Sequence, residues 1–336
     1  MSIKHCIIHS IKRPQEGGEV SINIRKAENT PEGPIVSLFT QLKHSFQRSA
    51  VRQYGLFDPE QSDNPLPGWL KQLESESMGF ASVTKNLTEH FKLKLEEIKD
   101  GFSAHLLFVV EELLEESHLY IFWINHTEAQ FIDSELDIEN LEYIEASKMN
   151  YVMKLDFNQW QVENWQQYLT VITSRGNKEI GHAFLQFCGF VSSVNLQQQT
   201  DEFLTIVDEY AQTLSDEDSK TYKNKIVDYC VEQDMQGNAV NIKNLSEELN
   251  SQNPEHFSDF VKEKQEEPKE EIYAHRNSLK KFVRFYGREK DLSISFSSDM
   301  MGDNIIYNPD SGELILKSVP KSLQQQIAKY LNNVKE

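Results

Sequence analysis

The pattern of hydrophobic and polar residues predicts a strand-rich N-terminal region. An apolar run from Ile3 to Ile11 and an alternating run from Val20 to Ile24 flank the sequence PQEGGE, whose proline and glycines predict a hairpin turn. Two long apolar runs, HLLFVVE at 105–111 and HLYIFWIN at 118–125, predict a pair of strands, and YVMKLDF at 151–157 predicts a third. Together these segments predict an antiparallel sheet.

Helices are predicted between these strands. Apolar residues recur at helical spacing from Pro34, which suits a first helical turn, to Ala50. The sequence YGLFDPEQSDNPLPGW at 54–69 contains three prolines and two glycines, which predicts a loop. Residues 70–98 are predicted to form the next helix.

Helical spacing dominates from about Trp160 onward, where apolar residues are separated by three and four positions. Two shorter helices are predicted within 241–264. The four longer helical segments are predicted at 165–172, 181–191, 201–214 and 222–233.

The pattern changes again after EKQEEPKEE at 263–271, a charged segment without aliphatic or aromatic residues that predicts a linker. Beyond it, apolar residues alternate with serines from Leu292 to Phe296. The runs IIY and LILK then flank the turn sequence NPDSGE, and 319–331 has the apolar face of a closing helix.

The predicted fold class is α+β, with a mixed N-terminal α/β domain that contains an antiparallel sheet, a helical middle and a small C-terminal α+β module. The predicted boundaries are 1–158 for the N-terminal domain, 159–262 for the helical region, 263–271 for the acidic linker and 272–336 for the module with a basic helix.

Composition indicates a soluble cytoplasmic protein. Hydrophobic residues make up 38% of 336 residues, enough for cores, yet no run approaches the roughly 18 apolar residues of a membrane span. The N-terminal sequence does not resemble a signal peptide. Cys6, Cys188 and Cys230 are odd in number and far apart, which predicts buried thiols in a reducing compartment and no disulfide framework.

Charge is distributed unevenly along the chain, whose formal net charge is −19. Residues 1–52 carry eight Lys or Arg against four Asp or Glu, and residues 272–336 carry ten against seven. The stretch 53–271 holds sixteen against forty-two. Because salt screens charges beyond about 8 to 10 Å, a basic face at either end can attract an anion despite the negative total.

The sequence RNSLKKFVRFYGREK at 276–290 concentrates six basic residues and one acidic residue. Its apolar residues fall at i, i+3, i+4 and i+7 from Leu279 to Tyr286, which predicts a short helix ended by Gly287. On that helix, basic residues every four positions from Arg276 to Arg288 would form a ridge suited to a phosphate backbone. A solvated face, neutralised by the acidic segment before it, is the alternative.

Two further groups could support binding of nucleic acid. A second basic ladder, which includes His44, lies near the end of the first long helix. The segment SRGNKEIGH at 174–182 could hold a phosphate on the backbone amides at the start of a helix. The alternative for this segment is a tight turn between helices. The candidate nucleic-acid-binding residues are Arg276, Lys280, Lys281, Arg284, Arg288, Lys290, Lys43, Arg48, Arg52, Arg175 and Lys178.

The sequence contains no motif that predicts a catalytic residue, a metal site or a cofactor. HCIIH at 5–9 would place His5 and His9 on one face of a strand and Cys6 on the other, so side chains of a half-exposed strand are favoured over a metal site. EELLEE at 111–116 is interpreted as a charged turn. We find no nucleophile motif or HExxH motif.

The order of several segments resembles the NdpA (YejK) family of bacterial nucleoid-associated proteins. The resemblance runs over essentially the whole chain. It rests on YGLF, the strand pair LLFVV and YIFWI, SRGNKEIGHAFLQFCG, IVDYCVEQ, HRNSLKKFVRFYG followed by LSISF, and IIYNPDSGELILK.

The resemblance implies a cytoplasmic protein of the bacterial nucleoid that binds nucleic acid without catalysis and interacts with type II topoisomerases. We therefore expect binding to DNA, mainly to the duplex backbone with low sequence specificity, with RNA as an alternative ligand and a homodimer left open. The alternative is an acidic protein-interaction module that acts on a DNA-processing partner such as a type II topoisomerase, so that DNA association is indirect. No membrane partner is expected.

Overall fold

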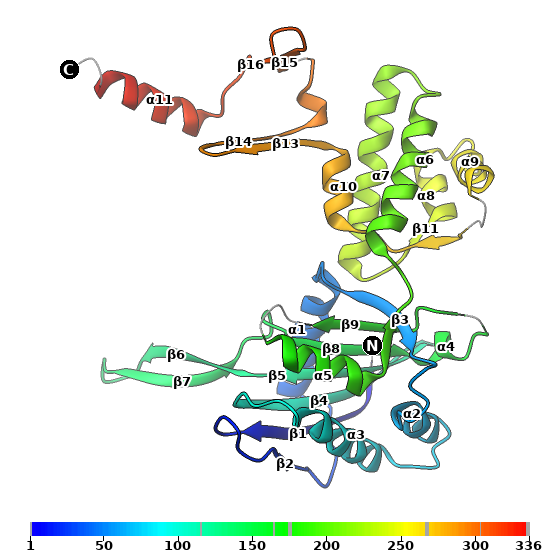
Figure 1. Ribbon diagram of the computed structural model, residues 1–336, viewed down its shortest axis with the longest axis vertical. Coiled ribbons are helices and arrows are strands. Elements are labelled where there is room, and N and C mark those ends of the chain that lie inside the picture. The colour runs from blue at the N-terminus through cyan, green and yellow to red at the C-terminus, as the bar shows by residue number, and fades with distance from the viewer. Residues whose placement is uncertain are drawn as a thin grey trace. The chain divides into compact units, whose positions relative to one another are not determined.

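The protein has an α+β architecture, as predicted (Figure 1). The computed structural model describes residues 2–114, 116–163, 165–173, 177–265, 269–302 and 304–333. The chain divides into two compact units, which are described separately. The first holds Met1–Asn195 with Met235–Gly237, and the second holds Leu196–Asp234 with Asn238–Glu336.

The first unit is built on an antiparallel sheet that has eight strands within the described residues, in the order β10-β3-β9-β8-β5-β4-β1-β2. The predicted hairpin and the three predicted apolar strands are present in it. The strands are β1 (Ser2–Arg13), β2 (Ser21–Asn23), β3 (Gln53–Phe57), β4 (Phe102–Leu113), β5 (Glu116–Ile124), β8 (Tyr151–Asp156), β9 (Leu169–Thr173) and β10 (Phe190–Ser192).

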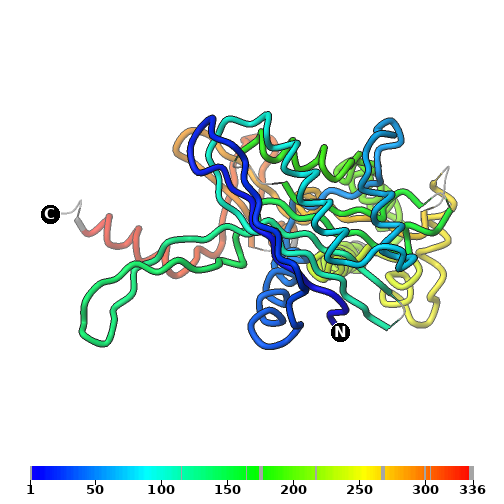
Figure 2. Tube along the Cα trace, turned by 90° about the horizontal axis from the view of Figure 1, so that it is seen from below, coloured from blue at the N-terminus to red at the C-terminus, as the bar shows by residue number. Residues whose placement is uncertain are grey.

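Helices cover both faces of this sheet, with α1 on one side and α3 and α5 on the other (Figure 2). Successive residues point to opposite faces, so Phe108 of β4 joins the core beneath α3 and α5 whereas Val109 joins the core beneath α1. Burial on both faces explains the continuous apolar runs of β4 and β5. The helices are α1 (Pro34–Arg48), α2 (Leu66–Glu74), α3 (Phe80–Leu95), α4 (Phe157–Trp160) and α5 (Lys178–Cys188).

The helix predicted at 165–172 is wrong, because this segment contains strand β9. Val171 belongs to one core and Ile172 to the other. A short strand buried on both faces has apolar neighbours on each side, and their spacing can imitate that of a helix.

The predicted loop at 54–69 and the predicted helix at 70–98 also differ from the structure. Strand β3 occupies the start of the loop, where a Cβ atom on Gly55 would lie 2.0 Å from the carbonyl oxygen of Val191 in β10. Helix α2 begins at Leu66, within the predicted loop. The predicted long helix is instead two helices, α2 and α3, and the chain between them includes Glu76, whose φ is 55°. Gly55 is therefore required by close strand approach and does not mark a loop.

Two strands between β5 and β8 were not predicted at all. Strands β6 (His126–Ile132) and β7 (Ile138–Ile144) pair with each other, and neither is hydrogen-bonded to another strand of the described chain. They project from the sheet as an arm (Figures 1 and 2). Most of their side chains are exposed, so no buried face gave the sequence a clear period.

The second unit begins with a helical cluster that agrees with the predictions for 201–214, 222–233 and 241–264. Phe203, Ile226, Leu245 and Phe257 lie in its core. No helix among the described residues is long and apolar enough to cross a membrane. The elements are α6 (Leu196–Ala211), α7 (Asp216–Gln236), β11 (Val240–Asn241), α8 (Ile242–Leu249), α9 (His256–Lys264), β12 (Glu271–Ile272) and α10 (Arg276–Phe282).

The remainder of the second unit contains two β-ribbons and a helix. Strand β13 pairs with β14, and the predicted hairpin around NPDSGE is confirmed by the pairing of β15 with β16. The predicted closing helix is confirmed as α11. The elements are β13 (Arg284–Glu289), β14 (Leu292–Ser297), the 3-10 helix η1 (Ser298–Met300), β15 (Ile305–Asn308), β16 (Glu313–Leu316) and α11 (Lys321–Asn333).

The three cysteines are buried and free, as the sequence predicts. Burial raises the pKa of the Cys188 thiol well above its usual range and the pKa of Cys230 to about 12. Both thiols therefore stay protonated near neutral pH and act as small apolar groups.

Candidate nucleic-acid interface

The basic segment at 276–290 is not one helix, which corrects the prediction. Helix α10 ends at Phe282, and β13 begins at Arg284 and pairs along its length with β14. Gly287 lies inside β13 and does not have a positive φ, so it is not a helix cap. Tyr286, expected on the buried helical stripe, is 68% exposed. The predicted helical ridge from Arg276 to Arg288 therefore does not exist.

The strand nevertheless places two of the predicted arginines on one face, because residues two and four apart in a strand point the same way. Arg284, Tyr286 and Arg288 share this face. The register pairs them with Ser297, Ser295 and Ser293 of β14, whose side chains share the same face. We call these six residues the serine-arginine face, and the two strands together the basic ribbon.

The serine-arginine face is open and carries no carboxylate, since Glu289 of β13 lies on the opposite face. All residues of β13 are exposed. The guanidinium of Arg284 donates a hydrogen bond to the hydroxyl of Ser295 at 3.2 Å. Apart from Glu289 the side chains of the opposite face are apolar, and there the ring centroids of Phe285 and Phe296 lie 5.3 Å apart. The ribbon thus separates a cationic, hydroxyl-rich side from a hydrophobic side.

Three predicted lysines lie close to the ribbon in the sequence. Lys280 and Lys281 are exposed in the last turn of α10, and Lys290 is exposed in the turn between β13 and β14 with a φ of 41°. Lys281 also lines a surface groove that contains the carboxylates of Asp201 and Asp208. It is therefore the least suited of the three to attract a phosphate.

Arg276 is removed from the candidate surface by an ion pair. Its Nε atom donates to the carboxylate of Asp234 in α7, and the arginine side chain is only 18% exposed. The pair connects the start of α10 to the helical cluster, so Arg276 has a structural role in this unit.

Lys43 is likewise a structural residue, with a side chain that is only 13% exposed. Its Nζ atom lies 2.6 and 2.7 Å from the two carboxylate oxygens of Glu111, whose side chain is fully buried. Glu111 lies in β4, which also corrects the interpretation of 111–116 as a turn, because β4 continues to Leu113 and β5 begins at Glu116. A buried carboxylate needs such a partner, since an unpaired buried charge is costly.

The rest of the second basic ladder does not form one exposed surface either. Arg52 is 3% exposed, and its guanidinium lies 5.8 Å from the centroid of the Tyr54 ring. Arg48 and His44 are exposed on α1 and line a shallow depression. Of the predicted ladder, only Arg48 and His44 are presented to solvent.

The predicted phosphate site at 174–182 is only partly described, because Arg175 lies outside the described residues. Lys178 is exposed at the start of α5. The side chain of Asn177 accepts hydrogen bonds from the backbone amides of Glu179 and Ile180, both at 3.0 Å. Because Asn177 caps the helix, these two amides are not available to a phosphate. The preceding described element is strand β9, which ends at Thr173, so a turn between two helices is not what this segment forms.

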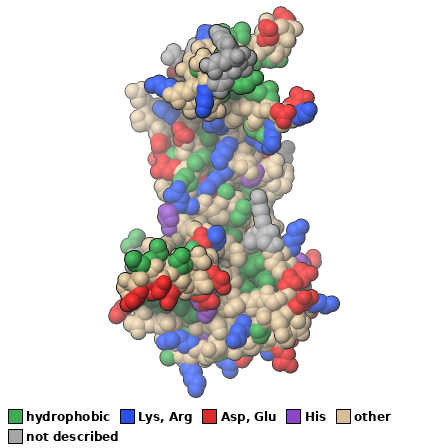
Figure 3. Space-filling view, turned by 90° about the vertical axis from the view of Figure 1, so that its left-hand side faces the viewer, with side chains coloured by type: hydrophobic (Ala, Val, Ile, Leu, Met, Phe, Trp, Pro, Cys, Tyr) green, Lys and Arg blue, Asp and Glu red, His purple; other side chains and the backbone are tan. Residues whose placement is uncertain are grey.

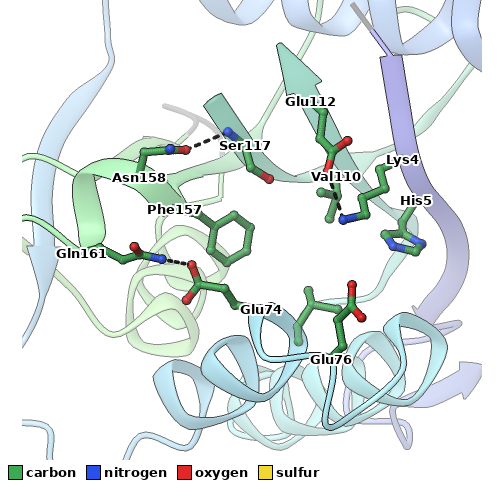
Figure 4. A pocket seen from close by; sticks show the side chains of 11 residues that line it. Lys4, His5, Glu74, Glu76, Val110, Glu112, Ser117, Phe157, Asn158 and Gln161 are labelled. Atoms are coloured by element: carbon green, nitrogen blue, oxygen red, sulfur yellow. Dashed lines mark hydrogen bonds and ion pairs between the residues drawn. The ribbon is translucent and has the colours of Figure 1, made fainter. Parts of the chain in front are cut away.

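A cavity of about 250 Å³ in the first unit is lined by Lys4, Glu74, Glu76 and Glu112 above apolar side chains (Figure 4). The Nζ atom of Lys4 lies 3.0 Å from a carboxylate oxygen of Glu112. Three carboxylates against one paired lysine give this cavity the wrong charge for a nucleic acid.

The HCIIH segment has the predicted strand geometry, with His5 partly exposed as expected and His9 buried. Both histidines face α3. The imidazole of His5 stacks on the ring of Phe80 with the centroids 5.1 Å apart, and Nε2 of buried His9 lies 3.1 Å from the hydroxyl of Thr84. Cys6 points to the other face and joins the core beneath α1. Within the described residues, no three His, Cys, Asp or Glu side chains come together as a metal-binding group.

Comparison with known proteins supports the family resemblance. A protein-family model described as nucleoid-associated protein YejK matches residues 7–324. Nucleoid-associated proteins of Pseudomonas syringae pv. tomato, Pseudomonas putida and Pseudomonas fluorescens are 26%, 27% and 28% identical to this chain. Each comparison covers 97% of this chain and 98% to 99% of the relative. The chain therefore belongs to the YejK family of nucleoid-associated proteins.

Proposed function

We propose that this protein binds the backbone of duplex DNA with low sequence specificity, without catalysis, at the bacterial nucleoid in the cytoplasm. The observation that carries the proposal is the serine-arginine face, where Arg284 and Arg288 flank an exposed tyrosine opposite three serines. Arginine and hydroxyl side chains are the groups that contact phosphate oxygens in protein–DNA interfaces. Membership of a nucleoid-associated family supports nucleic acid as the ligand of such a face.

The dimensions of the face fit a duplex backbone. Arg284 and Arg288 are four residues apart in an extended strand, or about 13 Å. This separation equals about four base-pair steps of B-DNA at roughly 3.4 Å each, so the two guanidinium groups can reach different phosphates. A two-stranded ribbon is also narrow enough to enter a major groove about 12 Å wide.

The experiment that tests the proposal compares neutral substitutions on the two faces of the same strand. We expect Arg284→Gln/Arg288→Gln to weaken binding of the purified protein to two duplexes of unrelated sequence by the same factor. Glu289→Gln, on the opposite face, is the matched control and should leave both affinities unchanged or slightly higher.

Substitution of the three serines by alanine separates hydroxyl contacts from charge. Ser293→Ala/Ser295→Ala/Ser297→Ala should weaken binding while the salt dependence stays that of the unchanged protein, because no charge is removed. If the purified protein shows no salt-sensitive binding to DNA, the proposal is wrong and association with the nucleoid is indirect.

A further inference from the structure

The β6–β7 arm, residues 126–144, is unusually acidic. It contains six Asp or Glu residues and no Lys or Arg. Glu128 lies directly opposite Glu142 in the strand pairing. Like charges in directly opposed positions destabilise a ribbon, so an isolated arm carries an electrostatic cost that a cationic partner would relieve.

The arm also exposes apolar side chains. Phe131 and Leu141 share one of its faces and are 40% and 49% exposed. On the other face Ile132 lies opposite Ile138, and both side chains are more than 60% exposed. Figure 3, which looks toward the end of the arm, shows hydrophobic side chains beside a row of Asp and Glu. Such a surface fits a partner that is both basic and apolar.

The negative charge and the exposed apolar side chains of the arm exclude several kinds of binding partner. A nucleic acid would be repelled by the six carboxylates, and a second arm would bring twelve carboxylates together without a Lys or Arg. The partner surface must instead supply positive charge and exposed hydrophobic groups in the form of an extended ribbon or groove.

The basic ribbon of this chain has those properties. It presents Arg284 and Arg288 on one face, with the exposed ring of Tyr286 between them. Its strands have six residues and those of the arm have seven, so both elements are about 20 Å long. Charge, hydrophobicity and length therefore match between the two elements.

We propose that the acidic arm of one copy of this chain lies along the basic ribbon of a second copy. Each copy has one arm and one ribbon, so the proposed symmetric dimer contains two equivalent contacts. The contact would neutralise the opposed pair Glu128 and Glu142 with Arg284 and Arg288 of the other copy.

One consequence rests on the proposed function. The arm and a DNA backbone are both anionic ligands of the same arginines, so DNA and the arm compete for the ribbon. Removing the charge of the arm is therefore expected to strengthen DNA binding, whereas removing that of the ribbon weakens it.

The test uses charge reversal in the full-length protein, measured by sedimentation velocity over a range of concentrations. The arm-reversed variant is Glu128→Lys/Glu142→Lys, which keeps a like-charge pair within the arm, and the ribbon-reversed variant is Arg284→Glu/Arg288→Glu. The control for the arm is Glu97→Lys/Glu247→Lys, which changes net charge equally at exposed helix or loop positions.

We expect each reversed variant alone to dissociate at least about tenfold more readily than the unchanged protein, because both contacts of its dimer become repulsive. An equimolar mixture of the two variants should associate again. In the mixed dimer one contact has the native charges and the other has both charges reversed, so both are attractive.

Three results would overturn the proposal: a protein that is monomeric at every concentration, variants that associate as the unchanged protein does, or a mixture that fails to associate although both variants have unchanged circular dichroism. The proposed function fails separately. If the mixture associates but the ribbon-reversed variant still binds DNA normally, the arm contact stands and the DNA site lies elsewhere.

Discussion

The clearest test of which basic residues are structural is replacement of Lys43. Its ammonium group is the partner of the fully buried Glu111 carboxylate, at 2.6 and 2.7 Å. Lys43→Met leaves that carboxylate buried without its hydrogen-bonded ammonium partner, and breaking a buried pair in this way costs about 3 to 5 kcal/mol. The free energy of unfolding should therefore fall strongly, although the substitution changes a single side chain of helix α1.

Tryptophan fluorescence during urea unfolding measures this change in the first unit alone, because all four tryptophans (Trp69, Trp123, Trp160 and Trp165) lie in Met1–Asn195. Lys85→Met, on an exposed position of α3, is the matched control and should change the free energy of unfolding by less than about 0.5 kcal/mol. The double variant Lys43→Met/Glu111→Gln should recover most of the loss, because no uncompensated charge then remains.

DNA affinity of the folded Lys43→Met protein should equal that of the unchanged protein. If Lys43→Met leaves the free energy of unfolding unchanged but reduces DNA affinity and its salt dependence, then Lys43 is a binding residue. In that case the reasoning from burial and ion pairing is refuted.

Two further predictions concern the first unit. Burial lowers the pKa of His9 to about 4 from about 6.5, so its neutral form stabilises the fold above pH 6.5 and up to about 3 kcal/mol is lost as the pH falls from 6.5 to 4. His9→Gln should flatten the pH dependence of the free energy of unfolding over that range, and equal slopes in both proteins would contradict this. Gly55→Ala should destabilise the first unit by about 1 to 3 kcal/mol in urea unfolding, because the new Cβ would lie 2.0 Å from Val191 O. Gly68→Ala, where no atom lies within 4 Å of the new Cβ, is its control, and equal effects of the two changes would be the contrary result.

Sequence pattern identified the parts of the fold in which one kind of burial dominates. Strands β4, β5 and β8 were recognisable because both faces are buried and their apolar runs are continuous. The same property hid β9, since a five-residue strand is too short to show a period. The arm was missed for the opposite reason: its exposed residues do not alternate between a core and solvent.

The candidate interface shows how two of the predicted arginines can share a face although the predicted element was wrong. Residues four apart share a face both on a strand and, approximately, on a helix, so the spacing of Arg284 and Arg288 does not distinguish the two. The alternation of serines with apolar residues from Leu292 to Phe296 was the signal for a ribbon. It implied a pairing partner for the residues before it. The burial of Arg52 and the ion pairs of Lys43 and Arg276 depend on tertiary contacts that no local spacing encodes.

The salt dependence of DNA affinity tests the central claim most directly. Each phosphate contact contributes about 0.9 to the slope of log affinity against log salt, so Arg284→Glu/Arg288→Glu should reduce that slope by about 1.8. Between about 50 and 200 mM salt this corresponds to a loss of affinity about tenfold smaller than in the unchanged protein. Lys26→Glu/Lys243→Glu, which makes the same change in net charge at exposed positions, should leave the slope unchanged. An equal slope in the ribbon variant and the unchanged protein would contradict the account.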